Sequence, residues 1–128
     1  MSLLDRRFLF VVGKGGVGKS AVATSIAVAA ASRGKRTLLA MVECKERVSE
    51  FLGVAPIGPH VVRNVRPNLD AVNMVPEVAL EEYGMMILKV RALYKLIFEN
   101  RLVRAFLDGV PGMASWSMLG KAFFHASP

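Results

Sequence analysis

Two continuous apolar runs frame the first forty residues of the chain. Residues 8–12 read Phe-Leu-Phe-Val-Val and residues 37–42 read Thr-Leu-Leu-Ala-Met-Val, with an alanine-rich stretch at residues 21–32 between them. Apolar runs of strand length without alternation are typical of strands buried on both faces of a parallel sheet. Gly34 follows the alanine-rich stretch, where a glycine is expected to end a helix. The pattern predicts a strand–helix–strand unit, the start of an α/β fold with a parallel sheet.

The remainder of the chain changes its period from strand-like to helical. A Pro- and Gly-rich passage at residues 53–59 precedes two short β-like runs at residues 61–65 and 69–75. After Pro76, apolar residues recur every three or four positions, which predicts one helical face. Its members are Tyr83, Ile87, Val90, Tyr94 and Ile97. Further helices are predicted at residues 101–108 and 116–124, on either side of a break at Pro111 and Gly112. We expect a single incomplete domain, with a core over residues 1–75 and a helical subdomain over residues 76–128.

The segment between the first apolar run and the alanine-rich stretch carries the clearest chemistry. Residues 13–20 read Gly-Lys-Gly-Gly-Val-Gly-Lys-Ser, in the strand–loop–helix setting that a phosphate-binding loop requires. Glycines let successive backbone N–H groups turn toward an anion, and the helix N-terminus adds the positive end of its dipole. We expect ATP or ADP here, with Lys19 on the β- and γ-phosphates and the Ser20 hydroxyl ligating Mg²⁺. The predicted nucleotide-binding residues are Gly13, Lys14, Gly15, Gly16, Val17, Gly18, Lys19, Ser20 and Ala21. The alternative is a glycine-rich turn without a ligand.

Lys14 is an additional lysine near the start of this loop. The loop resembles the deviant phosphate loop of the MinD, ParA, nitrogenase-iron-protein and ArsA group of dimeric nucleotide switches. In that group the additional lysine crosses the dimer interface and contacts the nucleotide of the partner subunit. The resemblance implies a catalytic role for Lys14, because a cation on the transferring phosphate stabilises the charge of the transition state. The alternative is a solvated lysine at the mouth of the loop.

Later landmarks narrow the resemblance to the ArsA-type ATPases. They are the stretches at residues 43–53, 68–73, 79–83 and 110–113, which occur in the order of the family. The family includes the bacterial arsenite-pump ATPase and the eukaryotic ATPase that delivers tail-anchored membrane proteins. The resemblance runs over essentially the whole chain. It implies a P-loop NTPase fold in which ATP closes two subunits and hydrolysis reopens them.

Two departures from the family pattern bear on activity. Glu43 stands where the family has its switch I aspartate, which positions the attacking water, so the resemblance assigns Glu43 a catalytic role. Its side chain places the carboxylate one methylene further from the backbone than aspartate would. The neighbouring family residues Pro-Ala-His are replaced by Cys44, Lys45 and Glu46. The switch II segment is absent before Pro128, so we expect this chain to be the N-terminal part of an ArsA-like ATPase, either a fragment or half of a split protein. The alternative for Glu43 is a solvated residue at a strand end.

Composition limits the remaining classes. The hydrophobic fraction is 53% and mean hydropathy is +0.41, yet no apolar run reaches the roughly 18 residues of a membrane helix. We therefore expect a cytoplasmic protein that associates with a partner or belongs to a larger fold. Cys44 is the only cysteine, which excludes an intrachain disulfide and a cysteine-based zinc site. The net charge of +7 is dispersed, so nucleic-acid binding is weakly supported, whereas peripheral membrane contact stays open.

The helical region 77–125 coincides with the client-facing subdomain of the family. The resemblance therefore implies a homodimer or a heterodimer with a paralogue, and a protein partner or hydrophobic client on these helices. Met85, Met86, Met113 and Met118 would suit an adaptable groove, although methionines at helical spacing also fill ordinary cores. The leading hypothesis is an Mg²⁺–ATP-dependent ATPase. Two alternatives stand beside it: a non-catalytic nucleotide-binding or interaction module, and a MinD- or ParA-like spatial organiser.

Overall fold

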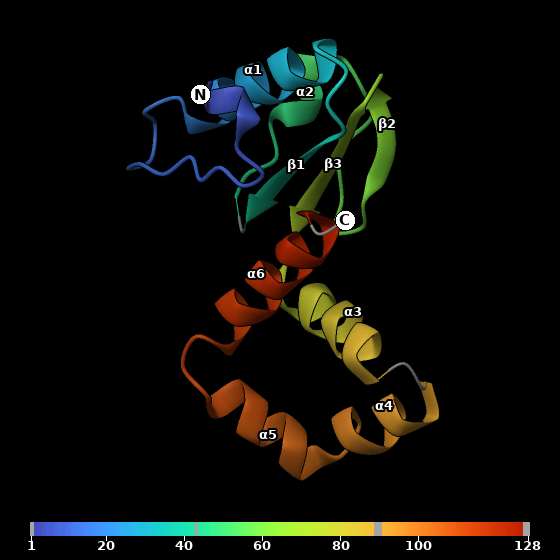
Figure 1. Cartoon of the computed structure of the whole chain (residues 1–128). Helices are drawn as coiled ribbons and strands as arrows, with labels where there is room; N and C mark the ends of the chain where they lie inside the picture. Colours follow the sequence, from blue (N-terminus) through green and yellow to red (C-terminus); the bar gives the residue numbers. More distant parts are fainter. Residues whose placement is uncertain (1, 43, 89–90, 127–128) are drawn as a thin grey trace. The chain divides into compact units, whose positions relative to one another are not determined.

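The chain folds into two compact units, shown in Figure 1. The computed structural model describes residues 2–42, 44–88 and 91–126. The first unit, here the sheet unit, ends at Met74, and the second, the helical unit, begins at Val75. The sheet unit holds a 3-10 helix (Leu3–Asp5), two α-helices and three strands, and the helical unit holds four α-helices. All of these counts refer to the described ranges.

The sheet has the strand order β1–β3–β2. Strand β1 (Thr37–Val42) runs parallel to β3 (Leu69–Met74), with Thr37 opposite Leu69 and Val42 opposite Met74. Strand β2 (Val62–Arg66) is antiparallel to β3, so the prediction of a parallel sheet holds only for the β1–β3 pair. The reason is the connection: only two residues join β2 to β3, and so short a link can only reverse the chain. Asn68 makes that reversal with a φ of 62°, a left-handed conformation that asparagine tolerates.

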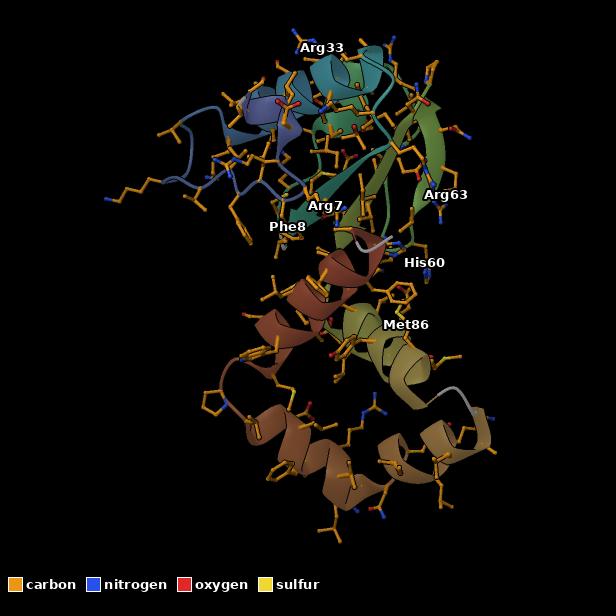
Figure 2. The ribbon with its side chains drawn as sticks, in the orientation of Figure 1. Arg7, Phe8, Arg33, His60, Arg63 and Met86 are labelled. Carbon is orange, nitrogen blue, oxygen red and sulfur yellow. The ribbon has the colours of Figure 1, made fainter. Side chains whose placement is uncertain are left out.

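The predicted strand at residues 8–12 does not form. This segment is irregular, and no strand of the described residues pairs with it. Four of its five side chains are exposed, from 36% at Phe8, labelled in Figure 2, to 84% at Val12, and Val11 is half-buried. A strand needs a neighbour to satisfy its backbone N–H and C=O groups, and β1 pairs with β3 alone. The apolar run indicated a tendency to be buried, but it could not specify a neighbouring strand to pair with. The predicted strand–helix–strand unit therefore lacks its first strand.

Helix α1 (Lys19–Ser32) packs against β1 and β3, helix α2 (Val48–Leu52) packs against α1, and both helices contribute to the core of the sheet unit. Their core contributions come from Ala27 and Ala31 on α1 and from Val48 and Leu52 on α2. On the strands the core face is formed by alternate residues, Leu39 and Met41 on β1 and Leu69 and Ala71 on β3. Val72 and Met74 on the other face of β3 are also buried. Both faces of β3 therefore contribute buried apolar side chains, although the strand also carries Asp70 and Asn73, which are half-buried.

Glycines end both of these helices. Gly34 follows α1 with a φ of 77°, and Gly53 follows α2 with a φ of 65°. The end of α1 was predicted correctly, whereas α2 itself was not predicted. Five residues are too few to form a stable helix in isolation. Val48 and Leu52 are 1% and 4% exposed, and burying two such side chains is worth about 1.5–3 kcal/mol each. Tertiary packing therefore stabilises α2.

The helical unit contains α3 (Pro76–Leu88), α4 (Arg91–Phe98), α5 (Arg101–Gly109) and α6 (Met113–Ala126). The predicted face from Tyr83 to Ile97 is divided between α3 and α4, and its member Val90 lies outside the described residues. Helices α3 and α6 pack together: the Tyr83 ring lies against Gly120, and the buried ammonium of Lys121 pairs with the Glu82 carboxylate. Within the described ranges, every helix falls short of the length and apolar character needed to cross a membrane.

Candidate functional site

The phosphate-loop segment joins the irregular residues 8–12 directly to the first turn of α1. Gly16 and Gly18 have φ angles of 79° and 85°, which L-residues with a Cβ rarely adopt. Gly13 is restricted differently, because a Cβ there would lie 2.9 Å from Cγ2 of Val17. The loop therefore uses glycine at three positions for backbone direction or space. A Cβ on Gly15, Gly16 or Gly18 would meet no atom within 4 Å, so the loop is open to a ligand.

Lys19 folds back over this loop. It is the first residue of α1, and its Nζ donates a hydrogen bond to the Lys14 carbonyl oxygen at 3.0 Å. The Lys19 side chain is thereby held against the backbone of the loop. Lys14 itself is exposed. The structure brings the two predicted lysines together through this side-chain-to-backbone bond.

The N-terminus of α1 is suited to an anion. Gly18 is the N-cap and provides no side-chain cap, and the first turn contains no acidic residue. The N–H groups of Lys19, Ser20 and Ala21 have no intrahelical acceptor by their position in the first turn. These donors and the helix dipole together favour a negatively charged ligand. Val17 and Ala21 are exposed beside them, so every predicted nucleotide-binding residue lies on one continuous segment.

The donor set fits Mg²⁺ in one limited way. Among the described residues no group of three His, Cys, Asp or Glu side chains could hold a metal ion. Mg²⁺ commonly uses one or two protein oxygens and takes its other ligands from water and substrate phosphates. Ser20, adjacent to Lys19 at the start of α1, is placed to be such a single ligand. The residues present are thus compatible with Mg²⁺ that arrives with a nucleotide.

A second group of residues follows the carboxyl end of β1. The predicted catalytic Glu43 lies outside the described residues, and Cys44 after it is exposed. The Glu46 carboxylate accepts hydrogen bonds from the Ser49 N–H at 2.8 Å, the Ser49 hydroxyl at 2.6 Å and the Ile57 N–H at 3.3 Å. Partial burial alone would raise the pKa of this carboxyl, but the hydrogen bonds outweigh it and hold the pKa below its ordinary value of 4.5.

Sequence reasoning missed the role of Glu46. It was noted only as a departure from the family pattern, and nothing in the sequence indicates that it meets Ser49 and Ile57 in the fold. Asn73 on β3 was missed as well. Its N–H donates to the Gly58 carbonyl at 2.9 Å and its Nδ2 to the Cys44 carbonyl at 3.5 Å, so it ties two loops to the sheet.

A polar pocket of about 260 Å³ lies elsewhere in the sheet unit. Its lining includes Thr37 and Asp70, which stand at the amino ends of β1 and β3. Asp70 is already paired there with Arg63, labelled on β2 in Figure 2, at 2.8 Å. Ligands of open α/β sheets bind at the carboxyl ends of the strands. This pocket is therefore not the predicted nucleotide site.

The other predicted residues are dispersed. Met118 is buried and fills the core of the helical unit, Met85 is 38% exposed, and Met86, labelled in Figure 2, and Met113 are half-buried. His60 is exposed in the sheet unit and His125 is half-buried near the end of α6. Among the described residues, the two histidines belong to no metal-binding cluster.

Comparison with known proteins decides the family. A protein-family model described as anion-transporting ATPase, the ArsA ATPase family, matches residues 6–124. The chain belongs to this family. The resemblance drawn from the phosphate loop and the later landmarks is thereby confirmed. No solved structure matches the chain.

Three curated relatives of this ArsA-family chain are named as ATPases. A Halobacterium salinarum protein with the provisional name arsenical pump-driving ATPase is 37% identical over 91 residues, which cover 70% of this chain. The arsenical pump-driving ATPases of Acidiphilium multivorum and Escherichia coli are 36% and 34% identical over 78 and 77 residues, each covering 59% of this chain. The matched region spans 14% of the first relative and 13% of the other two. These names support an ATPase type of function for the ArsA-family protein.

Proposed function

We propose that this chain forms the nucleotide-binding part of an Mg²⁺–ATP-dependent ATPase that switches between an open and a closed dimer. The observation that carries the proposal is the phosphate loop, which opens directly into α1 with Lys19 folded over it. In this proposal the loop N–H groups bind the phosphates of ATP or ADP, Lys19 contacts the β- and γ-phosphates, and Ser20 ligates Mg²⁺. When bound, Mg²⁺ offsets the negative charge of the phosphate oxygens.

Lys14 distinguishes this proposal from that of an ordinary nucleotide-binding domain. Its side chain is exposed at the loop, where it is accessible to a second subunit. We assign to it the role of reaching the nucleotide of the partner and stabilising the charge that develops on the transferring phosphate. Glu43 is assigned the positioning of the attacking water, on the family resemblance alone.

The helical unit supports coupling to a protein partner or a hydrophobic client. Leu102 and Phe106 on α5 are four residues apart and are 81% and 68% exposed. Trp116 and Phe123 on α6 are seven residues apart and are 70% and 67% exposed. These spacings place each pair on one face of its helix, and large apolar side chains exposed in this way commonly mark a binding surface.

Two measurements test the switch. Sedimentation velocity with and without Mg²⁺–ATP should show a nucleotide-dependent dimer for the wild-type protein and a monomer for Lys14→Ala. The affinity of Lys14→Ala for the nucleotide should differ from that of the wild-type protein by less than about threefold, because Lys14 acts across the interface. Single-turnover hydrolysis by the longest natural form of the wild-type protein should exceed that of the same form carrying Lys14→Ala by at least about tenfold. A wild-type protein that binds ATP but neither dimerises nor hydrolyses it would contradict the proposal.

That contradictory result is what the second candidate function predicts. A non-catalytic module would bind nucleotide through the same loop and use the apolar faces of α5 and α6 for assembly. The replacement of the family aspartate by Glu43 favours this alternative, since it moves the carboxylate away from the position that water activation requires. Hydrolysis therefore separates the two candidates, whereas nucleotide binding alone does not.

A further inference from the structure

We infer that Glu46 is a positioning residue that anchors residues 44–58 to the sheet unit and so limits the movement of the chain that follows β1. This inference rests on the proposed function for its consequence, but the anchoring itself is a property of the described residues. Residues 44–58 connect the carboxyl end of β1 through α2 to the loop before β2. We call them the β1–β2 connection.

The Glu46 carboxylate holds two distant parts of this connection at once. One oxygen accepts the Ser49 N–H at 2.8 Å, and the other accepts the Ser49 hydroxyl at 2.6 Å and the Ile57 N–H at 3.3 Å. Ser49 belongs to the first turn of α2, and Ile57 lies eight residues further along the chain. A single carboxylate thus closes the loop formed by α2 and the residues after it. Hydrogen bonds to a charged acceptor are about twice as strong as those between neutral groups.

The groups that Glu46 joins are fixed in the core. Val48, Leu52 and Ile57 are 1%, 4% and 3% exposed and belong to the cluster formed with α1, β1 and β3. Ser49 is also buried, at 6% exposure. Glu46 is therefore tied to atoms that can move little without unpacking the sheet unit. This makes it a firmly held residue of the β1–β2 connection.

Between β1 and Glu46, the described contact is weaker. The Cys44 carbonyl accepts a hydrogen bond from Asn73 Nδ2 at 3.5 Å, a distance at which such bonds contribute little. The buried Oδ1 of Asn73 has no hydrogen-bond partner among the described residues, so this amide is not locked by a second bond. The position of Cys44 therefore depends mainly on β1 on one side and Glu46 on the other.

Chain geometry carries the effect to Glu43. Two residues separate Glu43 from Glu46, so the chain keeps their Cα atoms within roughly 10–11 Å of each other. While the Glu46 carboxylate is anchored, this short stretch has one fixed end, and release of the carboxylate lets the residues after β1 explore more conformations. In the proposed ATPase, Glu46 would thereby regulate how well the residue assigned to water activation is held. Binding of ATP through the phosphate loop does not require this anchor.

The single cysteine provides the probe. Cys44 is exposed and is the only thiol in the chain, so a nitroxide spin label attached to it reports the mobility of the connection by electron paramagnetic resonance. Glu46→Gln should increase the label mobility, with a correlation time shorter by roughly twofold or more, because the neutral amide is a weaker acceptor and cannot accept at both positions. Glu50→Gln is the matched control, since Glu50 is an exposed glutamate on α2 in the same connection and loses the same charge.

Two outcomes would overturn the inference: equal mobility in wild type and Glu46→Gln, or equal increases in Glu46→Gln and Glu50→Gln. Ser49→Ala removes one donor without changing the charge, and it should also increase mobility, so it carries the test if Glu46→Gln fails to fold. These measurements need no nucleotide, and their outcome is independent of the proposed function. In a separate arm, Glu46→Gln should reduce single-turnover hydrolysis while leaving ATP affinity unchanged; a parallel loss of both would contradict a positioning role.

Discussion

Replacing Gly120 by alanine should destabilise the packing of α3 against α6. A Cβ at Gly120 would lie 2.6 Å from Cε2, 2.9 Å from Cζ and 3.0 Å from Cδ2 of the Tyr83 ring. Ordinary contacts begin near 3.4 Å, so the ring would have to retreat by about 0.8 Å. Overpacking of this kind costs about 1–3 kcal/mol, and alanine recovers about 1 kcal/mol because it favours a helix over glycine. Tyr83 is half-buried and can partly yield, so we expect a net loss near 1 kcal/mol.

Urea unfolding, followed by far-UV circular dichroism and by the fluorescence of Trp116, measures this loss. Trp116 is the only tryptophan and lies on α6, so its signal reports the helical unit. The decisive control is the same substitution in a Tyr83→Ala background. Without the ring, Gly120→Ala should become stabilising by about 0.5–1 kcal/mol, which reverses the sign of its effect. The reasoning is refuted if Gly120→Ala stabilises the wild-type protein or has the same effect in both backgrounds.

Three further predictions concern stability. Glu82→Ala removes the carboxylate that pairs with the buried Lys121 ammonium and should lower the free energy of unfolding by roughly 2–3 kcal/mol. This loss is below the usual range for buried pairs because the Glu82 side chain is 28% exposed. Lys121→Met should lower the free energy of unfolding by less, and equal losses of the two variants in urea unfolding would contradict the burial argument. Gly18→Ala should lower the free energy of unfolding by about 1–2 kcal/mol, because Gly18 has a left-handed φ that alanine disfavours. Gly15→Ala should leave the free energy of unfolding nearly unchanged in the same assay, because Gly15 has no positive φ and its Cβ would enter open space. The folded-state pKa of Glu46 is below its ordinary value of 4.5, so its contribution to stability is complete above pH 4.5 and is lost as pH falls through the folded-state pKa. In acid titration, Glu46→Gln should therefore lose less stability than the wild-type protein. An acid transition identical to that of the wild-type protein would refute the stabilising role of the Glu46 carboxylate.

The sequence predicted those elements whose signals are local and whose partners lie nearby in the chain. The alanine-rich stretch and the glycine after it define α1 to within two residues of its observed start. The run at residues 37–42 coincides with β1, because a continuous apolar run of strand length was followed in the chain by a strand able to pair with it. The helices α5 and α6 were likewise predictable from the break at Pro111 and Gly112.

The failures have a common physical cause, which is dependence on non-local contacts. Residues 8–12 have the composition of a buried strand, but no composition specifies which strand will satisfy the backbone. Helix α2 is stabilised by the burial of Val48 and Leu52 and by the bonds to Glu46, none of which is visible as a periodic pattern. The antiparallel direction of β2 follows from its two-residue link to β3, a signal that was present in the spacing but not used.

The candidate site shows the same division. The phosphate-loop motif was recognisable because its glycines, lysines and serine lie within one short segment, and in the structure this segment leads directly into α1, whose first residues are Lys19 and Ser20. The residues around the β1–β2 connection were not recognisable, because Glu46, Ile57 and Asn73 meet only when the sheet unit folds. A motif contained in one segment could be recognised in the sequence, whereas contacts between distant residues could not, and the nucleotide chemistry assigned to the motif stays a prediction.

Equilibrium binding of Mg²⁺–ATP to this chain, measured beside Lys19→Ala, tests the central claim most directly. Isothermal titration calorimetry on the wild-type protein should give micromolar affinity, and Lys19→Ala should weaken it by about 100-fold or more, since a charge-assisted contact to phosphate is lost. Lys45→Ala is the matched control, because this exposed lysine lies outside the loop and should leave affinity unchanged. A folded wild-type protein that does not bind Mg²⁺–ATP, or binds it equally well as Lys19→Ala, would contradict the assignment of residues 13–20 as the nucleotide site.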